Sequence, residues 1–287
     1  MEIQTFAAAG PFLEAMRPAF EAEEALNNLM YGLVLRLVAF PERIKATPYY
    51  ALVREEGVVQ LAALMTPPNN LLLYARGNIA QEDSLGLLVE NLAGGGWSIP
   101  GVLGPNMAAQ AFAQAWQARS GAAARLAVRE RAFELREVIP PPWPAGGMRL
   151  ARAEDLDLLA GWMVDFRAEA APHDPFSLEE ALEAVGYKIT DQDLYLWEDG
   201  QAVTMVGRSR PTPHGYCIGP VYTPRPFRGR GYASALTARA SQLQLEGGKQ
   251  FTALFTDLSN PTSNSIYQKI GYRPVCDFDL YRFSPSS

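Results

Sequence analysis

The chain has 287 residues, of which 48% are hydrophobic, so it can form one large domain or two ordinary domains, each with a real core. Its net charge of −6 argues against a general nucleic-acid binder, because affinity for a phosphate backbone needs a basic surface. The two histidines, without a Cys-x-x-Cys or His-Glu-x-x-His motif, argue against a metal held by the protein.

The sequence also predicts a cytoplasmic chain. It has no run of about 18 apolar residues that could span a bilayer, and residues 1–10 lack the basic and apolar stretches of a signal peptide. Cys217 and Cys276 lie in sequence unlike a disulfide scaffold, which favours a reducing compartment. We therefore expect neither membrane nor nucleic acid among its partners.

Residues 1–139 have the pattern of an α/β domain. Residues 8–38 can hold two helices, and residues 50–53 and 58–65 flank a hairpin signal, Glu55-Glu56-Gly57. Next along the chain we expect a strand at 71–75, a helix at 82–92, a strand at 97–103 and a helix at 105–118. Extended segments follow within 123–138. Residues 140–147, with four prolines and two glycines, can form neither a helix nor a central strand, and they predict a linker.

Residues 148–287 repeat this order. Residues 148–153 alternate like a strand, residues 154–170 have helical spacing, and Ser177 with Glu180 forms a capping box for another helix. We expect strands at 194–197, 202–208, 216–223 and 251–256, helices after residue 231 and at 261–270, and a final extended segment at 273–283. The shared order of elements indicates an internal duplication, although two unrelated α/β domains remain an alternative.

The turn Phe227-Arg228-Gly229-Arg230-Gly231-Tyr232-Ala233 lies between a predicted strand and a predicted helix. Backbone N–H groups gathered at a helix N-terminus bind phosphate, and the helix dipole favours negative charge there. A dinucleotide-binding fingerprint would need Gly or Ala at Ser234, and a P-loop would need Gly-Lys-Ser/Thr after the second glycine. Both nucleotide-binding motifs are therefore disfavoured. The matching place in the first half, Arg76-Gly77-Asn78-Ile79-Ala80, has a single glycine.

The turn fits Arg/Gln-x-x-Gly-x-Gly/Ala through Arg228, Gly231 and Ala233, and here the chain resembles the GCN5-related N-acetyltransferase family. Residues 219–224 and 228–234 look like the family's acetyl-CoA-binding strand and pyrophosphate loop. Residues 260–272 look like its second motif, with an asparagine seven residues before a tyrosine. The resemblance covers about residues 148–284, while the first half matches only in the order of its elements.

This resemblance implies the fold class. We expect an α/β protein of two domains like those of the GCN5-related N-acetyltransferases, each a mostly antiparallel sheet with splayed central strands and flanking helices. Residues 1–139 would be a degenerate copy, residues 140–147 the linker, and residues 148–287 the acetyl-CoA-binding domain. The degenerate copy would shape the acceptor cleft or an oligomer interface, which leaves a homodimer open.

The resemblance also implies the site residues. Tyr267 takes the position of the family's general acid, and a backbone N–H near Val221 that of the oxyanion donor. From periodicity alone, Tyr267 would be a core aromatic. The expected acetyl-CoA contacts are Val221, Tyr222, Thr223, Arg228, Gly229, Arg230, Gly231, Tyr232, Ala233, Ser234, Asn260, Ser263, Asn264 and Tyr267. Asn260 should in addition cap its helix.

The base that removes the amine proton is open, because residues 217–223 contain no carboxylate, unlike the cofactor strand of many family members. Asp257 is one candidate, although a turn or capping role is the more ordinary interpretation. Glu169, His173 and Asp174, with Phe166, lie where the family often binds acceptors. The neutral fraction of the amine could also suffice.

These residues predict an N-acetyltransferase that moves an acetyl group from acetyl-CoA directly to a primary amine of a small molecule or peptide. One alternative is an acyltransferase with another donor or acceptor. The other is a coenzyme A-binding sensor or scaffold module that catalyses nothing, and the missing strand carboxylate favours it.

Overall fold

The computed structural model of the protein describes residues 1–43, 46–170 and 175–284, apart from the side chains of Arg43 and Thr262. The chain forms two compact units. The first unit consists of Met1–Ala132, Thr256–Ser259 and Val275–Ser287, and the second unit of Phe133–Phe255 and Asn260–Pro274. In the described part of the chain, no helix combines the length and the apolar character needed to cross a bilayer.

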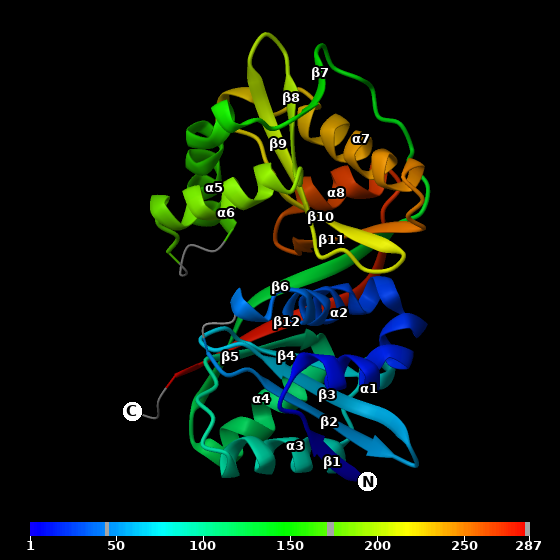
Figure 1. Ribbon diagram of the computed structural model, residues 1–287, viewed down its shortest axis with the longest axis vertical. Coiled ribbons are helices and arrows are strands. Elements are labelled where there is room, and N and C mark those ends of the chain that lie inside the picture. Colours follow the sequence, from blue (N-terminus) through cyan, green and yellow to red (C-terminus); the bar gives the residue numbers. More distant parts are fainter. Residues whose placement is uncertain (44–45, 171–174, 285–287) are drawn as a thin grey trace. The chain divides into compact units, whose positions relative to one another are not determined.

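The first unit is a sheet with helices on both faces (Figure 1). Its strands are β1 (Glu2–Thr5), β2 (Tyr49–Glu55), β3 (Val58–Met65), β4 (Leu71–Ala75) and β5 (Gly101–Pro105), antiparallel except for the pair β4–β5. One face carries α1 (Ala9–Ala22) and α2 (Glu24–Ala39), and the other α3 (Glu82–Gly94) and α4 (Asn106–Ser120). Helices can cover both faces because apolar side chains of the sheet point to both sides. In strand β2, Tyr50 and Leu52 pack in one core, and Ala51 and Val53 pack in the other.

The second unit repeats this architecture. Its strands lie in the order β11 (Phe251–Asp257), β10 (Gly215–Tyr222), β9 (Ala202–Ser209), β8 (Leu194–Glu198) and β7 (Gly147–Leu150), and only β10–β11 is parallel. Helices α5 (Leu156–Ala170) and α6 (Leu178–Thr190) cover one face, and α7 (Tyr232–Glu246) and α8 (Pro261–Lys269) the other (Figure 1). Short 3-10 turns are η1 (Pro41–Arg43), η2 (Arg76–Asn78), η3 (Ala153–Asp155) and η4 (Arg225–Phe227).

Each of the remaining two strands lies partly in the unit formed mainly by the other half of the sequence. Strand β12 (Arg273–Ser284) pairs antiparallel with β5, from Phe278 opposite Pro105 to Arg282 opposite Gly101, so its larger part belongs to the first unit. Strand β6 (Ala123–Leu135) ends in the second unit, where Phe133 packs in one core with Leu254. The compact units therefore differ from the predicted domains 1–139 and 148–287: Phe133 and the residues after it belong to the second unit, and Thr256–Ser259 and Val275–Ser287 to the first.

The predicted fold class is confirmed, including the splayed central strands. The parallel pair β4–β5 is held only at Leu71 opposite Val102 and Leu72 opposite Leu103. The parallel pair β10–β11 is held only from Gly215 opposite Phe251 to Cys217 opposite Ala253. Beyond Cys217 and Ala253 no pairing joins β10 to β11, so the second unit contains a fork. In the first unit, β4 and β5 remain close one residue further, since a Cβ built on Gly104 would lie 2.8 Å from Leu73 Cβ.

Two local predictions need correction. The strand expected at 97–103 begins only at Gly101, directly after Pro100, which has no N–H for a sheet ladder. Strand β1 was not predicted, because its four residues include only one apolar side chain, Ile3. The capping box before α6 is confirmed: the N–H of Glu180 donates to Ser177 Oγ, and the N–H of Ser177 donates to Glu180 Oε2.

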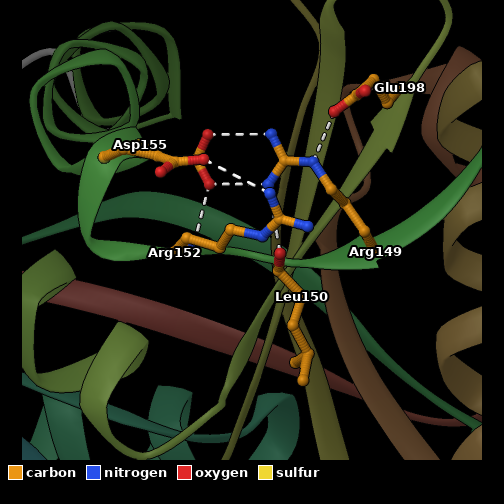
Figure 2. Close-up of polar contacts among 6 residues, drawn as sticks. Arg149, Leu150, Arg152, Asp155 and Glu198 are labelled. Atoms are coloured by element: carbon orange, nitrogen blue, oxygen red, sulfur yellow. Dashed lines mark hydrogen bonds and ion pairs between the residues drawn. The ribbon is translucent and has the colours of Figure 1, made fainter.

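A cluster of charges fixes the start of α5 (Figure 2). The two Nη atoms of Arg149 on β7 donate to the Asp155 carboxylate at 2.7 and 2.9 Å, and its Nε donates to Glu198 of β8 at 2.5 Å. The N–H of Arg152 also donates to Asp155. Because both charges are largely buried, these contacts tie the turn before α5 to the edge of the sheet.

Candidate functional site

The fork of the second unit opens at Cys217, the last residue of β10 that pairs with β11. On its other side, β10 pairs with β9 up to Ile218 opposite Arg208 and again from Val221 opposite Val206. Gly219 and Pro220 form a bulge between these pairings. Because of the bulge, Ile218 and Val221 both face the α7 core, although residues three apart in a regular strand face opposite ways.

The glycine-rich turn leads from β10 into α7. Gly229 and Gly231 have φ values of +77° and +83°, which L-residues with a Cβ rarely adopt. Gly231 is the N-cap of α7, and no side chain caps the helix there. The N–H groups of Tyr232, Ala233 and Ser234 thus have no acceptor within the helix. Unsatisfied N–H groups at the positive end of a helix dipole can bind an anion.

Other contacts hold this turn in place. The hydroxyl of Tyr232 donates to Asp199 Oδ2 at 2.5 Å, which ties the start of α7 to the β8–β9 hairpin. The Oγ1 of Thr204 on β9 lies 2.8 Å from the carbonyl of Tyr222 and 2.7 Å from Thr223 Oγ1. The end of β10 and the start of α7 are thereby fixed on either side of the glycines.

Arg228 contacts Glu169, a residue that the sequence places in the expected acceptor region. Its Nη2 donates to both carboxylate oxygens of Glu169, at 2.9 and 2.8 Å, and its Nε donates to the carbonyl of Thr223 at 2.8 Å. Its guanidinium lies over the ring of Tyr222, 5.7 Å from the centroid. The Nε of Arg225 is 3.7 Å from Glu169. An expected cofactor residue and an expected acceptor residue therefore contact each other.

Tyr267 lies on α8 and is buried, with 8% of its surface exposed. Burial raises the pKa of its phenol to about 12, nearby Cys217 adds to the rise, and a hydrogen bond with Ser263 opposes it. Its ring meets that of Tyr272 edge to face, with centroids 6.0 Å apart. The phenol is therefore protonated throughout the neutral pH range, so in a proton transfer it can act as an acid.

The second motif forms the start of α8. Asn260 is its N-cap and accepts from the N–H of Ser263 at 3.1 Å, as expected for this residue. Asn264 Nδ2 donates to the carbonyl of Asn260 at 2.8 Å. Through Ser263, this cap is connected to the phenol of Tyr267.

The described candidate bases have polar contacts of their own. Glu169 binds Arg228, and Asp257 Oδ1 accepts from the N–H of Ser259 at 2.7 Å in a turn. Phe166 packs against the core below α5. His173 and Asp174 lie outside the described residues. Across residues 1–43, 46–170 and 175–284, no three His, Cys, Asp or Glu side chains are grouped to hold a metal ion.

Sequence reasoning missed two features of the site. The bulge at Gly219 and Pro220 had a signal, since a Gly-Pro pair inside a strand indicates an interruption of the ladder. The contact between Glu169 and Arg228 had none, because 59 residues separate the two side chains.

The first unit has a different helix start after its β4 strand. Its turn holds Gly77 and Asn78 at φ values of +66° and +64°, and α3 begins with Glu82 and Asp83. Two carboxylates in the first turn of a helix already occupy the positive end of its dipole and repel a second anion.

Comparison with known proteins connects this geometry to a family. Residues 199–280 match the family model described as FR47-like protein. An N-alpha-acetyltransferase MAK3 from Arabidopsis thaliana is 34% identical over 73 residues, which are 25% of this chain and 38% of that protein. The chain thus spans well under half the length of this curated relative.

Solved structures extend the likeness to the whole chain. A GCN5-related N-acetyltransferase from Sphaerobacter thermophilus is 18% identical, with 98% of this chain and 94% of that chain covered and a TM-score of 0.62. A tandem GNAT protein from the clavulanic acid biosynthesis pathway is 16% identical, with 100% and 99% covered and a TM-score of 0.58. At these identities the structures show the fold, which is the one that the paired motifs predict.

Proposed function

Starting from membership in the GCN5-related N-acetyltransferase superfamily, which these matches support, we propose that the second unit binds acetyl-CoA and acetylates a primary amine. The observation that carries the proposal is the fork between β10 and β11, with an uncapped helix N-terminus beyond β10 and a buried phenol on α8. The motifs before α7 and α8 both contribute to this one unit.

The residues present fit the cofactor. The N–H groups of Tyr232, Ala233 and Ser234 would hold the diphosphate, and Gly229 and Gly231 let the backbone approach its oxygens. The separated edges of β10 and β11 leave backbone groups for the amides of its pantetheine arm. Acetyl-CoA would supply an activated acyl group as a thioester.

Each remaining role falls to a group of this chain. The backbone N–H of Val221, next to the bulge, is our proposed donor to the thioester oxygen. Tyr267 is our proposed general acid, which gives its phenolic proton to the departing sulfur. Because its pKa is raised to about 12, proton transfer must accompany the growth of charge on sulfur rather than precede it.

The amine proton is not assigned to a base in this proposal. Glu169 is paired with Arg228, and Asp257 accepts from the N–H of Ser259 in a turn. We expect the amine to react from its neutral fraction, so that turnover rises with pH up to the pKa of the acceptor. The amine acceptor itself is consistent with the name of the Arabidopsis relative, an N-alpha-acetyltransferase.

The test is Tyr267→Phe, with Tyr272→Phe as its control. Both substitutions delete a buried phenolic oxygen. We expect Tyr267→Phe to lower kcat by roughly 100-fold or more, in the range of general acid catalysis, with the Kd for coenzyme A unchanged. Tyr272→Phe should retain turnover in the folded protein. Equal turnover of Tyr267→Phe and wild type across the pH range would remove Tyr267 from this role.

Two observations favour a second function, a coenzyme A-binding sensor or scaffold without catalysis. Residues 217–223 carry no carboxylate, and Glu169 is held by Arg228. A screen for thiol release from acetyl-CoA with pools of amines separates the two functions. Release with any pool supports the enzyme, and a panel of acyl donors and hydroxyl acceptors then defines its donor and acceptor. Binding of coenzyme A without release supports the sensor.

A further inference from the structure

The last turn of α5 meets the cofactor turn through one carboxylate. Glu169 lies within 2.9 Å of Arg228 Nη2 by both oxygens and 3.7 Å from Arg225 Nε. All three side chains are partly exposed, with 40% of the Glu169 side chain accessible. The carboxylate is therefore reachable from solvent and can be replaced by another anion.

Arg228 is held in place independently of Glu169. The carbonyl of Thr223 accepts from its Nε, and the ring of Tyr222 lies beneath its guanidinium. A guanidinium fixed in this way presents its remaining N–H groups in one direction, and there they meet the Glu169 carboxylate. Carboxylate and phosphate bind a guanidinium with the same fork of oxygens, so one can substitute for the other.

The Glu169–Arg228 pair lies where replacement of the carboxylate by a phosphate would affect cofactor binding. Arg225 and Arg228 directly precede the glycines and the helix N-terminus that form the anion site. A negative side chain on these arginines cancels positive charge where a phosphate would bind. We propose that Glu169 is an internal competitor for the cofactor's phosphate: it occupies Arg225 and Arg228 in the ligand-free protein, and cofactor binding displaces it. This inference rests on the function proposed above.

Displacement of Glu169 also frees the end of α5. The contact joins the α5–α6 face of the sheet to the turn before α7, on the opposite face. Breaking it removes the ion pairs between α5 and that turn. Cofactor binding would therefore loosen the last turn of α5.

The experiment is calorimetric titration with coenzyme A of the wild-type protein, Glu169→Gln and Asp157→Asn. Asp157 is an exposed carboxylate at the other end of α5 and controls for the loss of one negative charge on that helix. Because exposed ion pairs are weak, we expect Glu169→Gln to tighten the Kd about two- to fivefold. Asp157→Asn should change it less, and raising the salt concentration should reduce the gain from Glu169→Gln.

A second pair of variants assigns the effect to the arginine. In an Arg228→Gln background, Glu169→Gln should give a clearly smaller gain, because its main partner is gone. A Kd that is unchanged or weaker in Glu169→Gln overturns the competitor role while the proposed function stands. If the wild-type protein gives no heat with coenzyme A, the proposed function fails and this inference fails with it.

Discussion

A single charged residue, Asp155, holds the turn before α5 in the second unit. Asp155 accepts from both Nη atoms of Arg149 and from the N–H of Arg152, and 8% of its side chain is exposed. The hydrogen bonds from Arg149 lower the pKa of Asp155 more than burial raises it. A carboxylate that is buried among donors in this way is needed in its charged form, because the donors would otherwise lose their acceptor.

We expect Asp155→Asn to lower the free energy of unfolding by about 2–4 kcal/mol, since it leaves the partly buried Arg149 with one carboxylate partner fewer. The measurement is denaturant unfolding at neutral pH. Glu154→Gln is the matched control, because the Glu154 side chain is 71% exposed and its contact with Arg152 is 3.3 Å long. The control should stay within about 0.5 kcal/mol of wild type.

The same pair of variants has a pH signature. A lowered pKa in the folded state means that the unfolded chain binds the proton more readily. Asp155 therefore contributes stability above its unfolded pKa of about 3.9, and that contribution is lost as the pH falls through the folded value. The difference between wild type and Asp155→Asn should shrink below about pH 4. A difference that is constant with pH would contradict the role of the charge.

At the scale of elements, helix α7 depends on the conformation of the residue before it. The φ of Gly231 is +83°, and a Cβ built there would have no atom within 4 Å. Space is therefore not the constraint, and the backbone conformation is. The uncapped start of α7 exists because the chain can turn through the left-handed region at this residue.

We expect Gly231→Ala to lower the free energy of unfolding by about 1–2 kcal/mol, the cost of a left-handed L-residue, and to weaken coenzyme A binding. Gly161→Ala is the control: Gly161 lies inside α5, has no positive φ and also has open space around a Cβ. Alanine is the better helix former, so this control should be neutral or stabilising. Equal losses in the two variants would show that the conformation at Gly231 is not limiting.

Whole-molecule organisation depends on the strand at the C-terminal end of the chain. Residues 278–282 of β12 pair with β5 in the first unit, and Tyr281 and Phe283 pack against its core. We expect deletion of residues 275–287 to expose the edge of β5. Hydrogen exchange should then lose protection in β5 and α4 of the first unit before α5 or α7 of the second.

A matched variant separates the contribution of the β12 side chains from that of the β12 backbone. The double substitution Tyr281→Ser and Phe283→Ser keeps the backbone but removes the side chains that pack on the first unit's core. It should give a smaller loss of protection in the same peptides. If either change lowered protection in the second unit first, β12 would not be a strand that stabilises the first unit.

The order of helices and strands was determined by the sequence itself. Apolar spacing, the capping residues Ser177 and Asn260, and the glycines before α7 act within a few residues, so each is visible in a short stretch. The two acetyltransferase motifs are likewise local, and they indicated the fold, which the solved structures share. The site residues that these motifs name remain predictions.

Tertiary structure alone decided which distant segments meet. Pairing of β12 with β5 joins residues more than 170 positions apart, and the contact of Glu169 with Arg228 joins helix α5 to the glycine-rich turn before α7. Such contacts depend on the course of the whole chain, since a strand edge or an arginine accepts many partners and its own sequence names none. Burial decided the acidity of Tyr267 in the same way, because its pKa depends on the cores that surround α8.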